Sequence, residues 1–263
     1  MNLITRTWHS SLGKKYVMAL TGIALFLFTI GHLVGNLQVF GSPDLINTYA
    51  HFLKSKPGLI WGARLGLLAC VGLHIAAAVT LSALNKEARP EPYASGTTYG
   101  STRASRTMLV SGLVILAFVV YHLAHFTALL PGVNGVGDFR KFEAVLPDGT
   151  RTHDVYAMMI LGFQVWWVVA FYLVAQWLLF THLGHGLASM FQSLGWRNHV
   201  WWPRIQTFAK VASLALFIGY SSMPAAIFMR LVGADYAEKK RFELKVSASL
   251  DVMTAANGKE VAK

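Results

Sequence analysis

The histidines of this chain occupy positions where an ionisable ring is rare. Four long apolar runs each hold one or two of them, namely His32, His74, His122 with His125, and His182 with His185. A polar ring in hydrocarbon is costly, so each is a candidate for a functional role. Two imidazoles from facing helices can ligate the iron of a b-type haem from both sides, and four can serve two haems. The spacing therefore predicts electron transfer through two bis-histidine haems, whose irons have no position left for a substrate.

Depth along the predicted helices groups the four histidines in two pairs. At about 1.5 Å per residue, His32 and His122 form one level and His74 and His182 a second level about 6 Å nearer the N-terminal side. The echo F-x-x-x-H-L at 28–33 and 118–123 favours His122 over His125. His185, three residues after His182, shares its helix face and could also reach an iron. The alternative is that each ring only bonds a neighbouring helix, which is worth about 0.6 kcal/mol.

Each ligating imidazole needs an acceptor for its second nitrogen, which fixes the ring's tautomer. The carbonyl four residues earlier in the same helix is the expected partner.

The elements that must position these rings are membrane-spanning helices. The chain has 263 residues, of which 54% are hydrophobic and 13% charged, and the charges lie between long uncharged runs. These runs cover 16–43, 65–85, 107–137, 155–196 and 205–229, the last interrupted by Lys210. Each has the 18 or more residues of a transmembrane helix. We predict an all-α integral membrane protein with five transmembrane helices, the first four bundled around two stacked haems.

The flanking segments complete the predicted organisation. Residues 1–15 form an N-terminal segment, 16–230 the five-span membrane domain, and 231–263 a polar tail that is a surface helix or disordered. The Pro147–Asp148–Gly149 turn indicates a hairpin within 138–154. Counted on alternating sides of the spans, ten Lys and Arg fall on the N-terminal side and six on the other, with the tail's seven discounted. This bias predicts a cytoplasmic N-terminus.

Composition excludes several other classes of protein. The net charge of +11 is spread along span edges as membrane anchors, which does not indicate nucleic-acid binding. The single Cys70 permits no internal disulfide, no Cys-ligated zinc and no iron–sulfur cluster. The rival function is a proton-coupled permease that uses buried histidines without haem. It would require intramembrane carboxylates, and none of the five runs contains an acidic residue.

Longer motifs around these histidines resemble a known family. They are Thr21-Gly22 followed by Gly31-His32, N-x-Y-x-H-F-L at Asn47–Leu53, the lone His74, and H-L-G-H-G-L-A-S-M-F-Q-S-L-G-W at His182–Trp196. Together they are similar to the dihaem cytochrome b membrane anchor of succinate:quinone oxidoreductase and fumarate reductase, the complex II family. The similarity covers about residues 10–230.

The resemblance implies the haem ligands. It assigns His32 and His122 to the haem nearer the outer face, and His74 and His182 to the haem nearer the cytoplasm. His182 stands thirteen residues before Gly195, as the ligand of that family does. Some members carry a proton-moving glutamate two residues before that ligand, where this chain has Phe180.

The resemblance also implies partners and place. The chain would be the quinone-reactive, non-dicarboxylate subunit, receiving or giving electrons through a separate iron–sulfur subunit and an FAD-containing flavoprotein subunit. The substrate would be a quinone, with menaquinone expected, and the site a bacterial inner (cytoplasmic) membrane in which the chain is multi-pass. A higher oligomer of the complex is compatible with this, and the direction of the reaction is left open.

Polar residues at the span ends are candidates for binding quinone and haem propionates. A quinone carbonyl needs a hydrogen-bond donor, and the candidates after the first span are Asn36, Gln38, Tyr49, His51 and Lys54. The alternative is a polar re-entrant loop that caps helix ends, with Asn47 and Tyr49 as interfacial anchors. Propionates favour cations, and the candidates are Lys15, Arg103 and Arg106, which could equally be solvated anchors.

Overall fold

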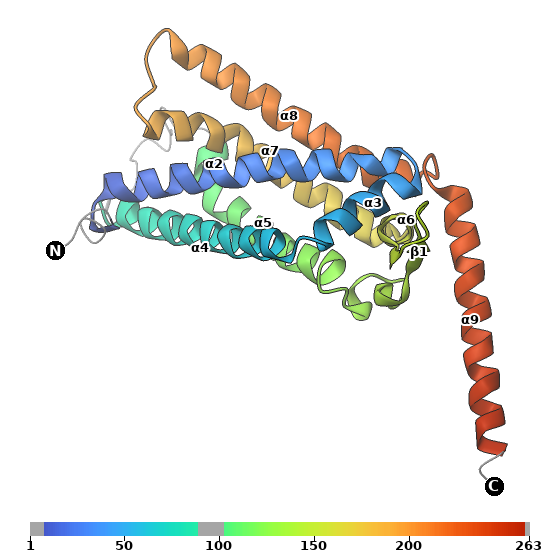
Figure 1. The fold of residues 1–263 in the computed structure, drawn as a ribbon. Helices are drawn as coiled ribbons and strands as arrows, with labels where there is room; N and C mark the ends of the chain where they lie inside the picture. Colours follow the sequence, from blue (N-terminus) through green and yellow to red (C-terminus); the bar gives the residue numbers. More distant parts are fainter. Residues whose placement is uncertain (1–7, 89–102, 261–263) are drawn as a thin grey trace.

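The computed structural model describes residues 8–88 and 103–260 and is built almost wholly of helices (Figure 1). Five helices in this part of the chain are long and apolar enough to cross a membrane. They are α2 (Ser11–Asn36, extended by the 3-10 turn η1, Leu37–Phe40), α4 (Pro57–Glu87), α5 (Arg103–Phe126), α7 (Trp166–Ser193) and α8 (Trp201–Phe228). The prediction of a multi-pass helical membrane protein is confirmed at this level.

Shorter elements connect and flank the five long helices. They are α3 (Pro43–Lys54), η2 (Pro131–Val133), η3 (Phe139–Lys141), β1 (Glu143–Val145), β2 (Arg151–His153), α6 (Val155–Gly162) and α9 (Ala234–Glu260). The strands β1 and β2 pair antiparallel, with Ala144 opposite Thr152. This confirms the predicted hairpin, whose turn places Gly149 at a φ of +84°.

Two predicted span boundaries are wrong. The run 107–137 stops being helical at Phe126, because Leu129 takes a left-handed φ of 54° and Pro131 follows. The run 155–196 divides into α6 and α7, with a break at 163–165. An unbroken helix over that run would measure about 63 Å, twice the thickness of the hydrocarbon layer. Hydropathy alone does not distinguish a helix buried in protein, such as α6, from one that faces lipid.

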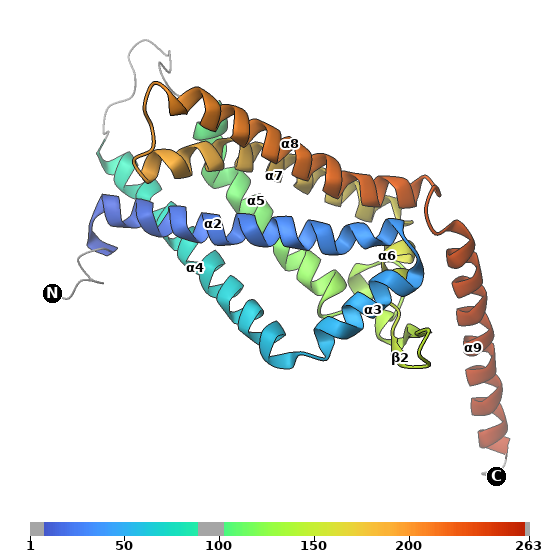
Figure 2. The same ribbon diagram turned by 45° about the horizontal axis from the view of Figure 1, so that its top comes forward.

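The long helices form a bundle with two distinct ends. Helix α2 packs on α4 and α7, α5 packs on α7, and α7 packs on α8. Figures 1 and 2 show the N-terminus and the α7–α8 connection at one end, which we call the N-terminal end. The opposite end, the hairpin end, carries α3, the hairpin, α6 and the start of α9. Large apolar side chains such as Leu65, Leu68 and Val110 are exposed on the outside of the bundle, as lipid contact requires.

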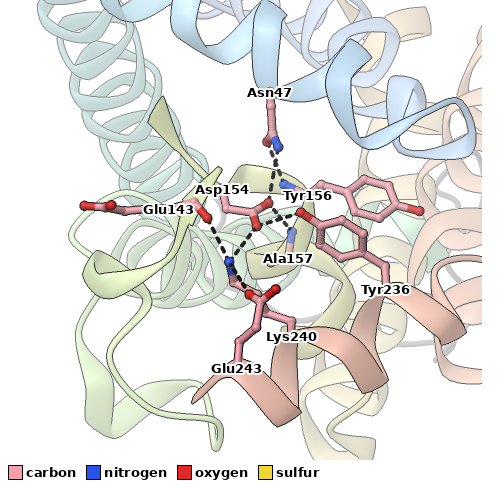
Figure 3. Close-up of polar contacts among 8 residues, drawn as sticks. All are labelled: Asn47, Glu143, Asp154, Tyr156, Ala157, Tyr236, Lys240 and Glu243. Atoms are coloured by element: carbon pink, nitrogen blue, oxygen red, sulfur yellow. Dashed lines mark hydrogen bonds and ion pairs between the residues drawn. The ribbon is translucent and has the colours of Figure 1, made fainter. Parts of the chain in front are cut away.

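The hairpin end contains a buried polar network (Figure 3). Asp154 is wholly buried and caps α6 by accepting from the Ala157 N–H at 2.9 Å. The carboxylate also accepts from Asn47 Nδ2 at 3.2 Å, from Tyr236 Oη at 2.8 Å and from Lys240 Nζ at 3.1 Å. Such a carboxylate is tolerated in the interior only because it is paired and hydrogen-bonded.

This network corrects one expectation about the flanking segments and decides between two alternatives for another. Asn47 is 1% exposed and bonds both Asp154 and the Tyr156 N–H at 3.0 Å, so it is a core residue and not an interfacial anchor. The polar tail is helical, and the first turns of α9 are fixed to the bundle through Tyr236 and Lys240. Burial and the hydrogen bond to Asp154 raise the pKa of the Tyr236 phenol.

Candidate functional site

Two of the predicted histidines lie toward the N-terminal end of the bundle, and we call His74 and His182 the near pair. The ring of His74, on α4, lies against α2, where a Cβ added to Gly22 would be 3.6 Å from its Cε1 atom. The ring of His182, on α7, lies against α5, where a Cβ added to Gly112 would be 3.4 Å from its Cε1 atom. The two rings are close enough to interact electrostatically.

The near pair is held by two short hydroxyl side chains. Thr21 Oγ1 lies 3.2 Å from His74 Nδ1, and Ser111 Oγ lies 3.2 Å from His182 Nδ1. Each hydroxyl donates its one proton to a carbonyl of its own helix, Val17 O at 2.7 Å and Met108 O at 3.1 Å. Each hydroxyl oxygen must therefore accept from the imidazole.

This bonding favours a proton on Nδ1 of both rings. With the proton on Nδ1, the lone pair of Nε2 is available for a metal. The expected acceptor, a carbonyl four residues earlier in the histidine's own helix, is not the partner that the structure shows. The true partners come from neighbouring helices.

The other two predicted histidines, His32 and His122, lie toward the hairpin end, and we call them the far pair. Their ring centroids are 5.8 Å apart and their planes are at 88°. Two imidazoles that each hold a metal at about 2 Å have centroids roughly 6 Å apart. The far pair thus has the separation that a shared iron requires.

The far pair is held less evenly than the near pair. His122 Nδ1 lies 3.2 Å from the hydroxyl of Tyr172, which is also 3.1 Å from His125 Nδ1. The Asn36 amide donates to the carbonyl of His32 at 2.7 Å, and its nitrogen is 3.4 Å from His32 Nδ1. Because an amide N–H is a donor, this contact does not favour a proton on His32 Nδ1. The tautomer that a metal needs is thus favoured for His74 and His182, is possible for His122, and is not set for His32.

The two levels lie farther apart than the sequence predicted. The near pair touches Gly22 on α2 and Gly112 on α5, and the far pair stands ten residues later on the same helices, at His32 and His122. Ten residues correspond to about 15 Å of helix, against the expected separation of about 6 Å. The sequence-based separation was wrong because each depth was measured from the expected end of its span, and those ends do not mark a common membrane plane.

His125 and His185 are poorer ligand candidates. His125 is wholly buried, and its Nε2 has no hydrogen-bond partner and would be 3.2 Å from a Cβ on Gly162. Its ring stacks on Phe126 with centroids 3.9 Å apart, so no macrocycle could reach it. His185 is half-buried, and no hydrogen bond to its ring is found within residues 8–88 and 103–260. The packing thus argues against His125, whereas His185 stays an alternative to His182.

An internal repeat underlies this arrangement. Helix α2 carries Thr21-Gly22 and then His32, and α5 carries Ser111-Gly112 and then His122, so that both read [T/S]-G-x9-H-L. In each helix the small pair holds a histidine of the next helix in the packing, His74 or His182. The echo F-x-x-x-H-L is the second half of this repeat. Extending it upstream would have matched Ser111 with Thr21; sequence reasoning missed Ser111 and gave Thr21 no role as the partner of a histidine.

The quinone candidates do not all lie together: some lie toward the far pair, and others lie by the hairpin or in η1. Asn36 lies beside His32, and the Tyr49 hydroxyl would be 2.9 Å from a Cβ on Gly35, so these two side chains lie toward the far pair. His51 Nδ1 lies 3.3 Å from Thr152 Oγ1 on the hairpin. Gln38 is half-buried in η1, where its carbonyl accepts from the Gly41 N–H at 3.0 Å.

Lys54 belongs to the hairpin side of the site. Its side chain is exposed, and partial desolvation lowers the pKa of its ammonium group. The neighbouring His153 is half-buried, its enclosed Nε2 has no hydrogen-bond partner, and partial burial followed by the charge of Lys54 lowers its pKa. Both groups thus resist carrying a charge. Sequence reasoning gave no signal for His153.

The propionate candidates stand at the N-terminal end. Lys15 and Arg106 are exposed there. Arg103 begins α5, and its side chain lies outside the described residues. Lys14, which the sequence did not single out, is buried and its Nζ is 6.0 Å from the centre of the Trp8 ring.

The paired histidines suit a metal that is already bound within a prosthetic group, because two side chains alone are too few to hold a bare ion. Within the described residues no three or more His, Cys, Asp or Glu side chains gather at one point to hold a bare ion. A haem supplies four nitrogens of its own and needs only two imidazoles from the protein. Comparison with known proteins gives no further guidance, since no family model, no curated protein and no solved structure matches the chain.

Proposed function

We propose that this chain is the dihaem cytochrome b membrane-anchor subunit of a succinate:quinone oxidoreductase or fumarate reductase. The observation that carries the proposal is the pairing of four intramembrane histidines at two levels. His32 lies 5.8 Å from His122 between ring centroids, and His74 and His182 lie at a second level, beside Gly22 and Gly112. Helix packing alone needs no such opposition, and the motifs described above resemble that family.

The residues of the chain would hold and orient the haems. When bound, each haem supplies a site for one-electron oxidation and reduction. Thr21 and Ser111 keep the Nε2 lone pairs of the near pair directed to the metal, and the Tyr172 hydroxyl does the same for His122. With two imidazoles on each iron, no coordination position is left for a substrate, so the sites carry electrons only.

The two levels provide a route for electrons along the bundle. Separate iron–sulfur and flavoprotein subunits would carry out the dicarboxylate chemistry, docking at the N-terminal end, for which the cytoplasmic side of a bacterial inner membrane is proposed. Asn36 and Tyr49, beside His32, would bind the carbonyl of a quinone such as menaquinone at the far level. His51 and Lys54 stand on the hairpin side, where they would connect that position with water.

A reduced-minus-oxidised absorption spectrum tests the proposal. The full chain, expressed with haem in excess and purified in detergent, is expected to show b-type bands, and a pyridine haemochrome assay is expected to give two haems per chain. A colourless preparation would reject the proposal and favour the permease. Copurification with an iron–sulfur and a flavin-containing subunit, followed by reduction of a menaquinone analogue by succinate, tests the assignment to complex II.

A further inference from the structure

We propose that Tyr172 is the positioning residue of the far haem, with His125 as the residue that orients the tyrosine hydroxyl. The inference rests on the proposed function. It concerns a group that touches neither quinone nor iron but sets the electronic character of one ligand, His122.

The geometry places one hydroxyl between two imidazoles. Tyr172 is 4% exposed on α7, and its hydroxyl is 3.2 Å from His122 Nδ1 and 3.1 Å from His125 Nδ1. A phenol has one proton to donate, so it donates to one ring and accepts from the other. The two histidines on α5 must therefore have opposite tautomers.

Packing decides which ring receives the proton of the tyrosine. His125 Nε2 is enclosed by Gly162 and Phe139, and its ring stacks on Phe126, so it cannot ligate a haem. His122 is the ring that faces His32. To ligate through Nε2 it must carry its proton on Nδ1, which it donates to the Tyr172 oxygen. The hydroxyl then donates to His125 Nδ1, leaving the His125 proton on the buried Nε2.

This chain of bonds affects the iron through His122. A hydroxyl that itself donates to a strong acceptor becomes a better acceptor, because successive hydrogen bonds polarise one another. His122 then gains electron density and stabilises the ferric state of its haem. His32, across the site, has the donor group of Asn36, and not an acceptor, beside its Nδ1 atom. The potential of the far haem is thus set from the α5–α7 side.

Redox titration of the variant Tyr172→Phe tests the inference. Both haems are expected to stay bound, the midpoint potential of one is expected to rise, and that of the other is expected to be unchanged. The matched control is Tyr220→Phe, because the ring of Tyr220 lies 6.3 Å from His32 while its hydroxyl donates to Thr29 O at 2.7 Å. This control removes a half-buried phenol oxygen at the same level without removing a ligand's partner, and it is expected to leave both potentials unchanged.

Two substitutions at position 125 test the orienting role. His125→Leu removes the acceptor and is expected to raise the same potential by less than Tyr172→Phe does. His125→Asn places an amide oxygen near the former Nδ1 and is expected to restore the wild-type potential. A general disturbance of packing would not be repaired by the smaller asparagine.

The outcomes separate this inference from the proposed function. Two bound haems whose potentials are unmoved by Tyr172→Phe would overturn the inference and leave the function standing. Wild-type protein without haem would overturn the function and the inference together. If Tyr172→Phe loses the far haem, the His125 variants decide the question. A midpoint potential that rises in His125→Leu and returns to the wild-type value in His125→Asn supports the inference. A potential that does not change in His125→Leu overturns it.

Discussion

The near and far pairs hold the same residue types by different means. His74 and His182 are each fixed by a short hydroxyl from a neighbouring helix, Thr21 or Ser111, and each ring lies against a glycine. The far pair lies among aromatic rings, with His122 beside the Tyr172 hydroxyl and His32 beside an amide. The near pair is therefore symmetric and locally specified, whereas the far pair is asymmetric and depends on the packing of the hairpin end.

The largest expected effect is the loss of one haem. His74→Ala and His182→Ala each remove a ligand of the near pair and are expected to reduce the haem content from two to one per chain, measured by pyridine haemochrome. His185→Ala, on the same helix as His182, is the control and is expected to retain both haems. Loss of both haems from either near-pair variant would show that the two levels are not independent.

The hairpin end is expected to unfold before the rest of the bundle when the buried ion pair between Lys240 and Asp154 is broken. Lys240→Met leaves the wholly buried Asp154 without its cation and is expected to destabilise the fold by about 3 kcal/mol, near the lower limit for such a pair because three other donors remain. Thermal release of the haems, followed by absorbance, is expected to lose the far haem before the near haem. Lys245→Met, exposed on the same helix, is the control. Simultaneous release of the haems at an unchanged temperature would contradict this view.

Steric change at a glycine is expected to disturb the near pair selectively. Gly112→Val adds methyl groups beyond a Cβ that would already be 3.4 Å from His182 Cε1, so the near haem is expected to lose occupancy. Gly72→Val is the matched control, because a Cβ there has no neighbour within 4 Å. Absorption spectra of protein expressed with increasing amounts of haem measure the occupancy of the near and far haem sites in each variant. Equal behaviour of the two variants would remove the role assigned to Gly112.

The smallest expected effect is electronic. Ser111→Ala and Thr21→Val leave a half-buried Nδ1–H without its acceptor, at a cost of about 1–3 kcal/mol. The potential of the near haem is expected to rise in both variants by similar amounts, as the symmetry of that pair requires. Thr29→Val is the control, since the Thr29 hydroxyl bonds only Leu25 O at 2.6 Å. Unequal shifts from Ser111→Ala and Thr21→Val would break the symmetry of the comparison.

The spans and the four histidines could be predicted because both depend on local features. An apolar run of sufficient length must cross the membrane as a helix, and an ionisable ring inside it is conspicuous. The ends of the helices could not be placed, because α6 is as apolar as a membrane span but is buried against α3 and α9. The burial of Asp154 could not be predicted either, because in the sequence it stands in a polar connecting segment where a charged residue is normally exposed.

The sequence by itself determined five apolar helices, the positions of the intramembrane imidazoles and the repeat [T/S]-G-x9-H-L. Each of these is a matter of spacing along one helix, which the fixed rise per residue converts into position. The tertiary structure alone decided that Tyr172 stands between His122 and His125, and that Lys240 reaches Asp154. These contacts join residues 47 to 86 positions apart, and only the packing of helices against one another brings such residues together.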